Sequence, residues 1–432
     1  MRQLLADKVN GNLVGLWLLI PEHLRLGTWD LVRGWTRQDG ECVESRLAMQ
    51  LIHEAALCAT GVRQQRALSQ RGFELANGLP FVASDTAIHH LLDDHTVADA
   101  QRLQVALGRI RRASGHFQSH LLAVDPHRIQ SHSKRQMRRF RGDESSKPKK
   151  VVQTFFALDP DTHQPVCFTI ASSSCTATKA GMELLDMAGE VLQPESGATM
   201  ALADSEHFSA DLIEHVVEQT PFEMLVPMVP QPALRKRWKA IPEEQFTRRW
   251  TGYATCKLPY KFSRSKVGPL YEFVQRVEEK PEKYRFHGYV STTDRDEVES
   301  LTADFPKRWH VEEFFNAHQA LGWNRAGTLN LNVRYGQMTM ALLAQAAISQ
   351  LRQRIGTPID TWDSAHLAKA FFSGMEGDVR VTGDTILVTY YNAPNVDELR
   401  QHYENLPEKL AEEEVDAQIP WLYNFKLDFR FR

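Results

Sequence analysis

Two aspartates that follow apolar segments are the residues best placed to do chemistry in this sequence. Asp125 ends the apolar run that begins at Leu121. Asp204 ends a second such run, which begins at Ala198. Ligands of open α/β sheets bind at the carboxyl ends of strands, so the two carboxylates would meet if their strands are neighbours. Because two close carboxylates repel each other unless a divalent cation neutralises them, the pattern predicts a metal site.

A later helical segment supplies the third acid, Glu312, with Glu313 beside it as the rival. Arg308 lies four positions before Glu312, so the two side chains share one helix face. Glu312 would point at the metal, while Arg308 would brace it or a phosphate oxygen. We expect neighbouring aromatic residues to bury an adjacent stripe of this helix against the sheet: Phe305, Trp309 and Phe315.

An alternation of strands and helices would position these acids. The expected strands are Leu121–Asp125, Val151–Leu158, Pro165–Ala171, Ala198–Ala203 and Phe222–Val229, and the expected helices are Ala177–Leu192 and Ala210–Gln219. Three strands, helix, strand, helix, strand is the order of an RNase H-like sheet. The pattern therefore predicts an α/β fold in which helices flank a mixed sheet, and an RNase H-like sheet is one fold that has this order.

The length of 432 residues is too great for one compact core, so we expect several domains. We predict a helical, DNA-binding domain at residues 1–118 and an RNase H-like catalytic domain at 119–356, with a β-rich insertion at about 230–293. A small α+β domain would follow at 357–432, with a hairpin turning at Gly383-Asp384 and an acidic helix near Val396–Glu413.

Composition limits the class of protein. Hydrophobic residues make up 42% and charged residues 24%, which is the balance of a globular chain and excludes a disordered one. The apolar stretch at residues 13–20 is too short to span a bilayer and lacks a basic leader. Five scattered cysteines without a Cys-x-x-Cys pair favour a reducing compartment. We expect a cytoplasmic, nucleoid-associated protein without a membrane partner.

The net charge of −3 conceals opposed local charges. Residues 128–150 and 235–266 are basic, whereas residues 404–416 are acidic. Basic stretches in a nearly neutral chain favour a polyanion partner, although a solvated surface loop is the alternative for any single stretch.

Basic residues and one aromatic residue are predicted to contact DNA. They are Arg128, Lys134, Arg135, Arg138, Arg139, Arg248, Arg249 and Trp250. The arginines and lysines would follow a phosphate backbone, and Trp250 would stack on an unpaired base. Packing in a small core is the alternative role for the tryptophan.

At these residues the sequence resembles the DDE transposases of the bacterial insertion-sequence type, in the branch with a β-rich insertion before the glutamate. The resemblance covers about residues 121–355. That branch carries Tyr-x2-Arg-x3-Glu-x6-Lys around the third acid, where this chain has Phe305, Arg308, Glu312 and Gln319. The arginine and glutamate match, whereas the tyrosine and lysine do not. Gln319 can hydrogen-bond to a phosphate but supplies no charge.

The resemblance implies that Asp125, Asp204 and Glu312 are the catalytic, metal-binding triad. Two Mg²⁺ ions, for which Mn²⁺ can substitute, would activate water and stabilise the leaving oxygen. The implied activity is cleavage of phosphodiester bonds at transposon ends, followed by strand transfer to target DNA. The implied partners are transposon-end DNA, target DNA and a second copy of the chain on DNA, with no organic cofactor. Arg308 and Gln319 would then contact DNA.

Two alternatives differ in class from an active transposase. One is a catalytically weakened, transposase-derived protein that only binds DNA, which the missing lysine favours. The other is a nuclease of the same fold that cuts without joining.

Overall fold

The computed structural model describes residues 9–11, 13–37, 43–59, 68–132, 134, 137, 139–140, 147–171, 175–263, 265–324 and 328–432. The chain divides into two compact units. The central unit is Arg112–Phe314, and the terminal unit combines Met1–Arg111 with Phe315–Arg432. These boundaries differ from the predicted division into three domains, because segments from both ends of the chain pack within one unit.

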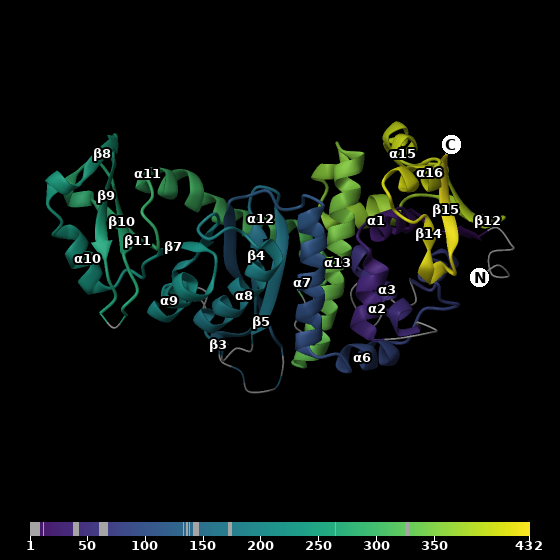
Figure 1. Cartoon of the computed structure of the whole chain (residues 1–432), viewed down its shortest axis with the longest axis horizontal. Helices are drawn as coiled ribbons and strands as arrows, with labels where there is room; N and C mark the ends of the chain where they lie inside the picture. The colour runs from purple at the N-terminus through teal and green to yellow at the C-terminus, as the bar shows by residue number, and fades with distance from the viewer. Residues whose placement is uncertain are drawn as a thin grey trace. The chain divides into compact units, whose positions relative to one another are not determined.

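The central unit contains the strands and helices that were expected around the two aspartates, coloured blue to green in Figure 1. Its elements, with short 3₁₀ and π segments labelled η, are β2 (Leu121–Gln130), β3 (Arg139–Phe140), β4 (Lys149–Asp159), β5 (Gln164–Ala171), α8 (Ala177–Leu192), β6 (Met200–Ala203), η3 (Ser205–His207), α9 (Ala210–Gln219), β7 (Glu223–Pro227), α10 (Pro232–Lys239), η4 (Glu243–Gln245), β8 (Thr247–Trp250), β9 (Tyr253–Tyr260), β10 (Leu270–Val277), η5 (Pro281–Lys283), β11 (Arg285–Ser291), α11 (Glu297–Glu299), η6 (Ser300–Asp304), η7 (Phe305–Trp309) and α12 (His310–His318), which crosses the unit boundary.

The centre of the sheet has the RNase H-like strand order β5-β4-β2-β6-β7. The first three of these strands are antiparallel neighbours, and β2, β6 and β7 are parallel to one another. Parallel neighbours need a crossover, which α8 and α9 provide, so the predicted fold class is confirmed. Side-chain caps from Thr176 and Ser209 begin these two helices.

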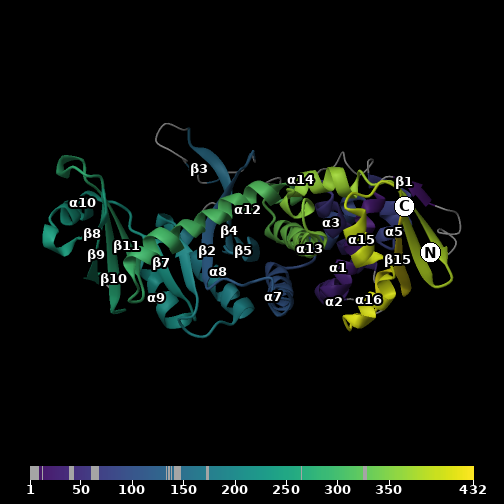
Figure 2. The ribbon, with the colours of Figure 1, turned by 90° about the horizontal axis from the view of Figure 1, so that it is seen from above.

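The two faces of this sheet are covered by different elements, as Figure 2 shows. The Cys167 thiol lies against the Leu184 carbonyl of α8 on one face. On the other face, the Phe156 ring lies against the Phe314 ring of α12, with centroids 5.9 Å apart. Because Asp125 pairs directly with Phe156 across the β2–β4 ladder, its side chain is on the α12 face.

The predicted β-rich insertion extends the same sheet rather than forming a separate layer. β11 pairs antiparallel with β7, and β10, β9 and β8 follow in order to the edge. The helix α10 packs Trp238 over this extension, where the indole donates a 2.7 Å hydrogen bond to Glu272. A Cβ at Gly288 would lie 2.4 Å from the Trp238 ring, so the contact requires glycine at that position.

The terminal unit packs helices from both ends of the chain with a small sheet. Its elements are β1 (Val9–Gly11), η1 (Val14–Leu19), α1 (Ile20–Arg25), α2 (Thr28–Thr36), α3 (Val43–Ala56), α5 (Arg71–Ala76), α6 (Asp85–Asp93), α7 (Val97–Ala113), η8 (Gln319–Leu321), α13 (Leu331–Ile355), η9 (Ile359–Thr361), α14 (Ser364–His366), η10 (Leu367–Phe372), β12 (Gly377–Thr382), β13 (Thr385–Tyr390), α15 (Val396–Tyr403), α16 (Leu406–Glu412), β14 (Gln418–Ile419), η11 (Pro420–Leu422) and β15 (Phe425–Phe431). The predicted hairpin at Gly383-Asp384 is present as β12–β13, whereas the predicted acidic helix is two helices, α15 and α16. β1 pairs with β12, so one sheet joins the two ends of the chain.

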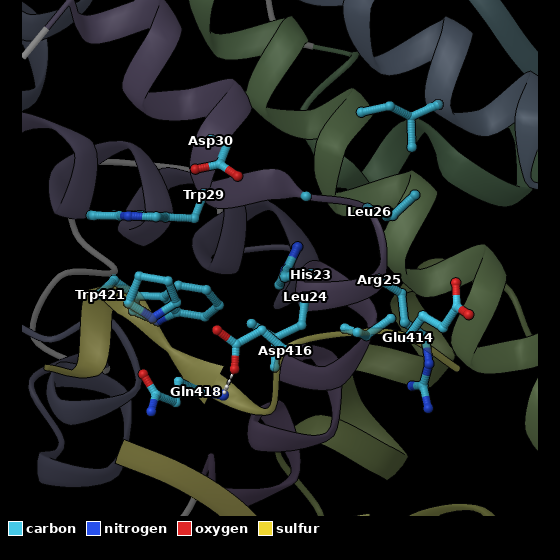
Figure 3. Close-up of a pocket in the computed structure, with 14 residues that line it drawn as sticks. His23, Leu24, Arg25, Leu26, Trp29, Asp30, Glu414, Asp416, Gln418 and Trp421 are labelled. Atoms are coloured by element: carbon cyan, nitrogen blue, oxygen red, sulfur yellow. Dashed lines mark hydrogen bonds between the residues drawn. The ribbon is translucent and has the colours of Figure 1, made fainter. Parts of the chain in front are cut away.

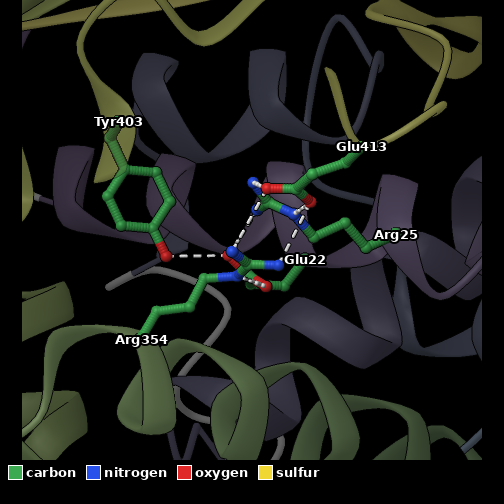
Figure 4. Close-up of polar contacts among 5 residues, drawn as sticks. All are labelled: Glu22, Arg25, Arg354, Tyr403 and Glu413. Atoms are coloured by element: carbon green, nitrogen blue, oxygen red, sulfur yellow. Dashed lines mark hydrogen bonds and ion pairs between the residues drawn. The ribbon is translucent and has the colours of Figure 1, made fainter. Parts of the chain in front are cut away.

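A buried ion network also joins the ends of the chain in the terminal unit (Figure 4). The fully buried carboxylate of Glu22 in α1 accepts from Arg25 at 2.8 Å and from the Tyr403 hydroxyl at 2.7 Å. Arg354 of α13 approaches Glu22 at 3.3 Å and Glu413 at 3.2 Å. Arg25 and Glu413 close the network at 2.6 Å. Each carboxylate therefore has guanidinium partners.

A pocket of about 490 Å³ lies in the terminal unit, between α1–α2 and the segment around β14 (Figure 3). Its lining mixes apolar rings, such as Trp29 and Trp421, with acidic side chains, such as Asp30 and Asp416. None of its lining residues is among those predicted to bind metal or DNA. Among the described helices, none has both the length and the apolar character needed to cross a membrane.

Candidate active site

The structure places Asp125 and Asp204 on neighbouring parallel strands. The last paired residues of the β2–β6 ladder are Val124 and Ala203, so each aspartate is the next residue at the carboxyl end of that ladder. We expected this strand to end at Asp125, whereas β2 continues alongside β4 to Gln130. The two aspartates are thus at the point where β2 loses its parallel neighbour, at the carboxyl ends of the parallel strands, where ligands of open α/β sheets bind.

Alternation along the strands aims both aspartates at the face covered by η7 and α12. Leu121 and Leu202 point to the same faces as Asp125 and Asp204, respectively, because strand side chains alternate with a period of two. Both leucines are buried in a cluster against which Phe305 of η7 packs. The apolar part of each strand thereby anchors the segment that carries the third acid.

Glu312, rather than its neighbour Glu313, acts on Asp125. Burial, and to a smaller extent the negative charges of Asp204 and Glu312, raise the pKa of Asp125 to about 7, although the charges of Arg308 and His207 oppose this rise. Glu313 is exposed, and its charge acts on His163 instead. Consecutive helical residues point about 100° apart, which explains the separation.

Arg308 forms its ion pair with Asp125. We expected the shared helix face to direct this guanidinium to Glu312 or to phosphate. The residue lies in the 3₁₀ segment η7, however, and α12 begins only at His310. The stretch from Arg308 to Glu312 is therefore only partly α-helical, and a contact of Arg308 with phosphate stays a prediction.

His207 holds Asp204 in place, a role that our sequence interpretation missed. Its Nδ1 lies 2.7 Å from the Asp204 carboxylate, and its ring is fully buried beside Phe155. Burial alone would raise the pKa of Asp204, but the hydrogen bond and charge of His207, together with Arg308, lower it below its usual value. The spacing Asp-x-x-His after a strand was the available signal, because Asp204 caps the short segment that ends at His207.

These residues fit a divalent cation. Asp125 and Asp204 follow one parallel ladder, and the charge of Glu312 acts on Asp125, where the charges of Arg308 and His207 oppose it. Burial is the largest cause of the raised pKa of Asp125, so a nearby cation would favour the ionised form of this carboxylate. Carboxylate oxygens are the ligands that Mg²⁺ and Mn²⁺ prefer.

The first predicted DNA-contact group lies on and near β3. Lys134 and Arg139 are exposed, whereas Arg135 and Arg138 lie outside the described residues. Arg128 stacks over the Phe140 ring at 3.9 Å and forms an ion pair with Glu206. Exposed Lys147 and Lys149 add positive charge beside β3. Figure 2 shows β3 projecting from the rest of the sheet.

The second predicted group lies on the edge strand β8. Arg248 is exposed, but Arg249 pairs with Glu297 and donates to Thr255. Trp250 remains 49% exposed and stacks on Tyr253 at 4.3 Å with an 8° angle between the rings. The two tryptophans of the insertion thus differ, since Trp238 is core and Trp250 presents an indole face to solvent.

The two positions that depart from the family motif have different surroundings. Phe305 packs edge to face against Tyr289, with ring centroids 5.0 Å apart. Gln319 does not continue the helix of Glu312, because α12 ends at His318. Trp309, which we expected to pack against the sheet, is 55% exposed, so that part of the predicted apolar stripe is wrong. Phe315 is buried as expected.

Comparisons with known proteins identify a family. The sequence matches the protein family described as "Transposase DDE domain" over residues 116–346, which is more than half of the chain. A comparison with curated proteins found no match. Among solved structures, a piggyBac transposase synaptic complex with hairpin DNA gives a TM-score of 0.40 at 12% identity, covering 85% of this chain and 82% of the other. A likeness this weak supports no inference.

Proposed function

This chain belongs to the transposase DDE domain family, and from that premise we propose that it cuts the phosphodiester bonds at transposon ends and joins the freed ends to target DNA. The family generally uses divalent metal ions. We further propose that Asp125, Asp204 and Glu312 hold two Mg²⁺ ions, which Mn²⁺ can replace.

One observation carries the proposal. Two carboxylates lie at the end of one parallel ladder, and the negative charge of a third, Glu312 of α12, acts on Asp125 beside the ion pair with Arg308. Such a cluster disfavours its own ionised form unless it binds a cation. Bound divalent ions supply an activated water and stabilise the charge on the leaving oxygen.

The chain's own residues hold and orient the participants. The buried ring of His207 holds one oxygen of the Asp204 carboxylate, which leaves the other oxygen for a cation. Arg308 holds Asp125 and presents a guanidinium beside the carboxylates, where it can neutralise a phosphate oxygen. The apolar packing of Phe305 keeps η7 against the sheet and thereby keeps Arg308 in reach.

We propose that DNA lies along two basic surfaces of the central unit. One comprises Lys134, Arg139, Lys147 and Lys149 around β3, whose exposed cations suit a phosphate backbone. The other is the β8 edge, where Trp250 offers its exposed indole to an unpaired base. Because two transposon ends must be brought together for joining, we propose a dimer on DNA.

The decisive experiment is cleavage and strand transfer on a plasmid that carries the DNA flanking the gene, with Mg²⁺ or Mn²⁺. We expect wild type to cut and join, and Glu312→Gln to lose on the order of 10³-fold or more in rate because a metal ligand is lost. Glu299→Gln, the same substitution at an exposed site in α11, is the matched control and should keep the wild-type rate.

The other outcomes separate the alternatives. Cutting without a strand-transfer product would identify a nuclease of the same fold. Tight binding to the flanking DNA without cutting would identify the DNA-binding descendant. Full activity in Glu312→Gln would remove this residue from the triad.

A further inference from the structure

A second cluster of metal-ligand side chains lies on the opposite side of the same helix turn that carries Glu312. His310 and Glu313 are three residues apart in the first turn of α12, and His163 lies in the turn between β4 and β5. One ligand atom from each of these three side chains lies within 4.8 Å of the others. None of the three belongs to the proposed catalytic triad.

The orientation of His310 is the one that a metal ligand needs. Its Nδ1 lies 2.6 Å from the Pro160 carbonyl oxygen, which accepts only, so this nitrogen carries the proton and donates. Nε2 is then the unprotonated nitrogen with a free electron pair. Metal-bound histidines characteristically donate their other ring N–H to a carbonyl or carboxylate in this way.

The nearby carboxylates already have other partners. Asp159 accepts from four backbone N–H groups, those of Gln118, Ser119, Asp161 and Thr162. Asp161 pairs with Lys307 at 2.8 Å. The cluster therefore offers two imidazoles and one carboxylate, with a remaining coordination position for water. The imidazoles are half-buried and Glu313 is exposed, so an ion can enter from the Glu313 side.

We propose that His163, His310 and Glu313 form a Zn²⁺ site, distinct from the carboxylate site and independent of the proposed transposase activity. Two imidazoles and one carboxylate are a frequent zinc ligand set, whereas magnesium sites use oxygen ligands. Zn–N and Zn–O bonds of about 2.0–2.2 Å require the ligand atoms to move somewhat closer together. The ring centroids of His163 and His310 are already 4.5 Å apart.

Zinc at this position would fasten the β4–β5 turn to the first turn of α12. In the sequence, Glu312 lies between His310 and Glu313, the two proposed zinc ligands of α12. The charge of Glu312 acts on Asp125. A bound ion would thus limit movement of the helix segment that presents Glu312. The site is a positioning device for that segment, and its occupancy can be measured without any DNA reaction.

The test measures Zn²⁺ binding to the full chain by equilibrium dialysis and by the rise in melting temperature. Asp125→Asn/Glu312→Gln serves as the parent, so that the carboxylate site does not contribute. We expect one tightly bound Zn²⁺ per parent chain, at least about tenfold weaker binding with His163→Gln or His310→Gln, and unchanged binding with the control His287→Gln. Glu313→Gln changes an exposed side chain, so it tests a ligand without disturbing the fold.

A spectroscopic measurement distinguishes this site from others. Co²⁺ bound at a four-coordinate site with imidazole ligands gives visible absorption, which His310→Gln should abolish. Absence of bound Zn²⁺ in the parent would overturn the proposal. Equal Zn²⁺ binding in the parent and in the His163, His310 and Glu313 variants would overturn it as well. Neither result would bear on Glu312→Gln cleavage.

Discussion

Two clusters of carboxylates, one in each compact unit, differ in their balance of charge. In the terminal unit, Glu22 and Glu413 face Arg25 and Arg354, so two negative charges meet two positive ones. In the central unit, the three carboxylates Asp125, Asp204 and Glu312 are opposed by Arg308 and by His207, so negative charges remain in excess among these residues. Burial is similar, since Glu22 and Asp125 are both inaccessible or nearly so.

This difference in charge balance separates a structural network in the terminal unit from a proposed binding site in the central unit. A buried ion pair with complete partners holds elements together, and in the terminal unit those elements come from both ends of the chain. A buried cluster with surplus charge costs stability and keeps its affinity for a cation. The balance of charge, rather than the presence of acidic residues, therefore distinguishes the proposed functional site from the structural network.

The largest expected effect is on stability in the terminal unit. Glu22→Gln leaves Arg25 and Arg354 without their buried partner, so we expect it to lower the free energy of unfolding by about 3–5 kcal/mol. Asp125→Asn removes a repelling charge and should cost far less. Thermal unfolding with a chelator present measures both.

Glu413→Gln is the matched control for Glu22→Gln. The Glu413 side chain is 34% exposed, so its removal should cost only about 0–1 kcal/mol. If Asp125→Asn destabilises the chain as much as Glu22→Gln does, the central cluster is also a structural network and the comparison fails.

The two clusters should respond to pH with opposite signs, with effects on the order of a few kcal/mol at most. Burial and the neighbouring carboxylates raise the pKa of Asp125 from 3.8 to about 7. Its protonated form therefore stabilises the folded state below pH 4, and this contribution is lost as the pH rises through 7. Burial raises the pKa of Glu413, but the hydrogen bond and charge of Arg25 outweigh burial and lower this pKa below 4.5. The ionised form of Glu413 therefore stabilises the folded state above about pH 4.5, and this contribution is lost in acid.

Melting temperatures between pH 3 and 8, with a chelator present, measure these contributions. The melting temperature of wild type minus that of Asp125→Asn should fall as the pH rises from about 4 to 7. The melting temperature of wild type minus that of Glu413→Gln should fall as the pH drops below about 4.5. Slopes of the same sign in both differences would contradict the assignment.

The smallest expected effect concerns His207, which orients Asp204. His207→Ala should raise the metal concentration needed for half-maximal cleavage by about 10–100-fold, because the ligand loses the hydrogen bond that fixes it. His207→Asn retains a donor near the Nδ1 position and should recover part of the affinity. Lower thermal stability with unchanged metal dependence would make His207 a core residue only.

The sequence by itself determined the local elements and the first two acids. Apolar runs and turn residues located the strands, and the expected helices Ala177–Leu192 and Ala210–Gln219 are α8 and α9. Asp125 and Asp204 were identifiable because an acid after an apolar strand is a local pattern. The β-rich insertion was also recognisable, from aromatic and branched residues between turns.

Only the tertiary structure decided which residues meet across the chain. The choice of Glu312 over Glu313 depends on how η7 and α12 rotate against the sheet, and the pairing of Arg308 with Asp125 depends on the same rotation. His207 became informative only once its ring was placed beneath Asp204. Partners such as Glu22 and Tyr403, which are 381 positions apart, are joined by packing that no local period encodes.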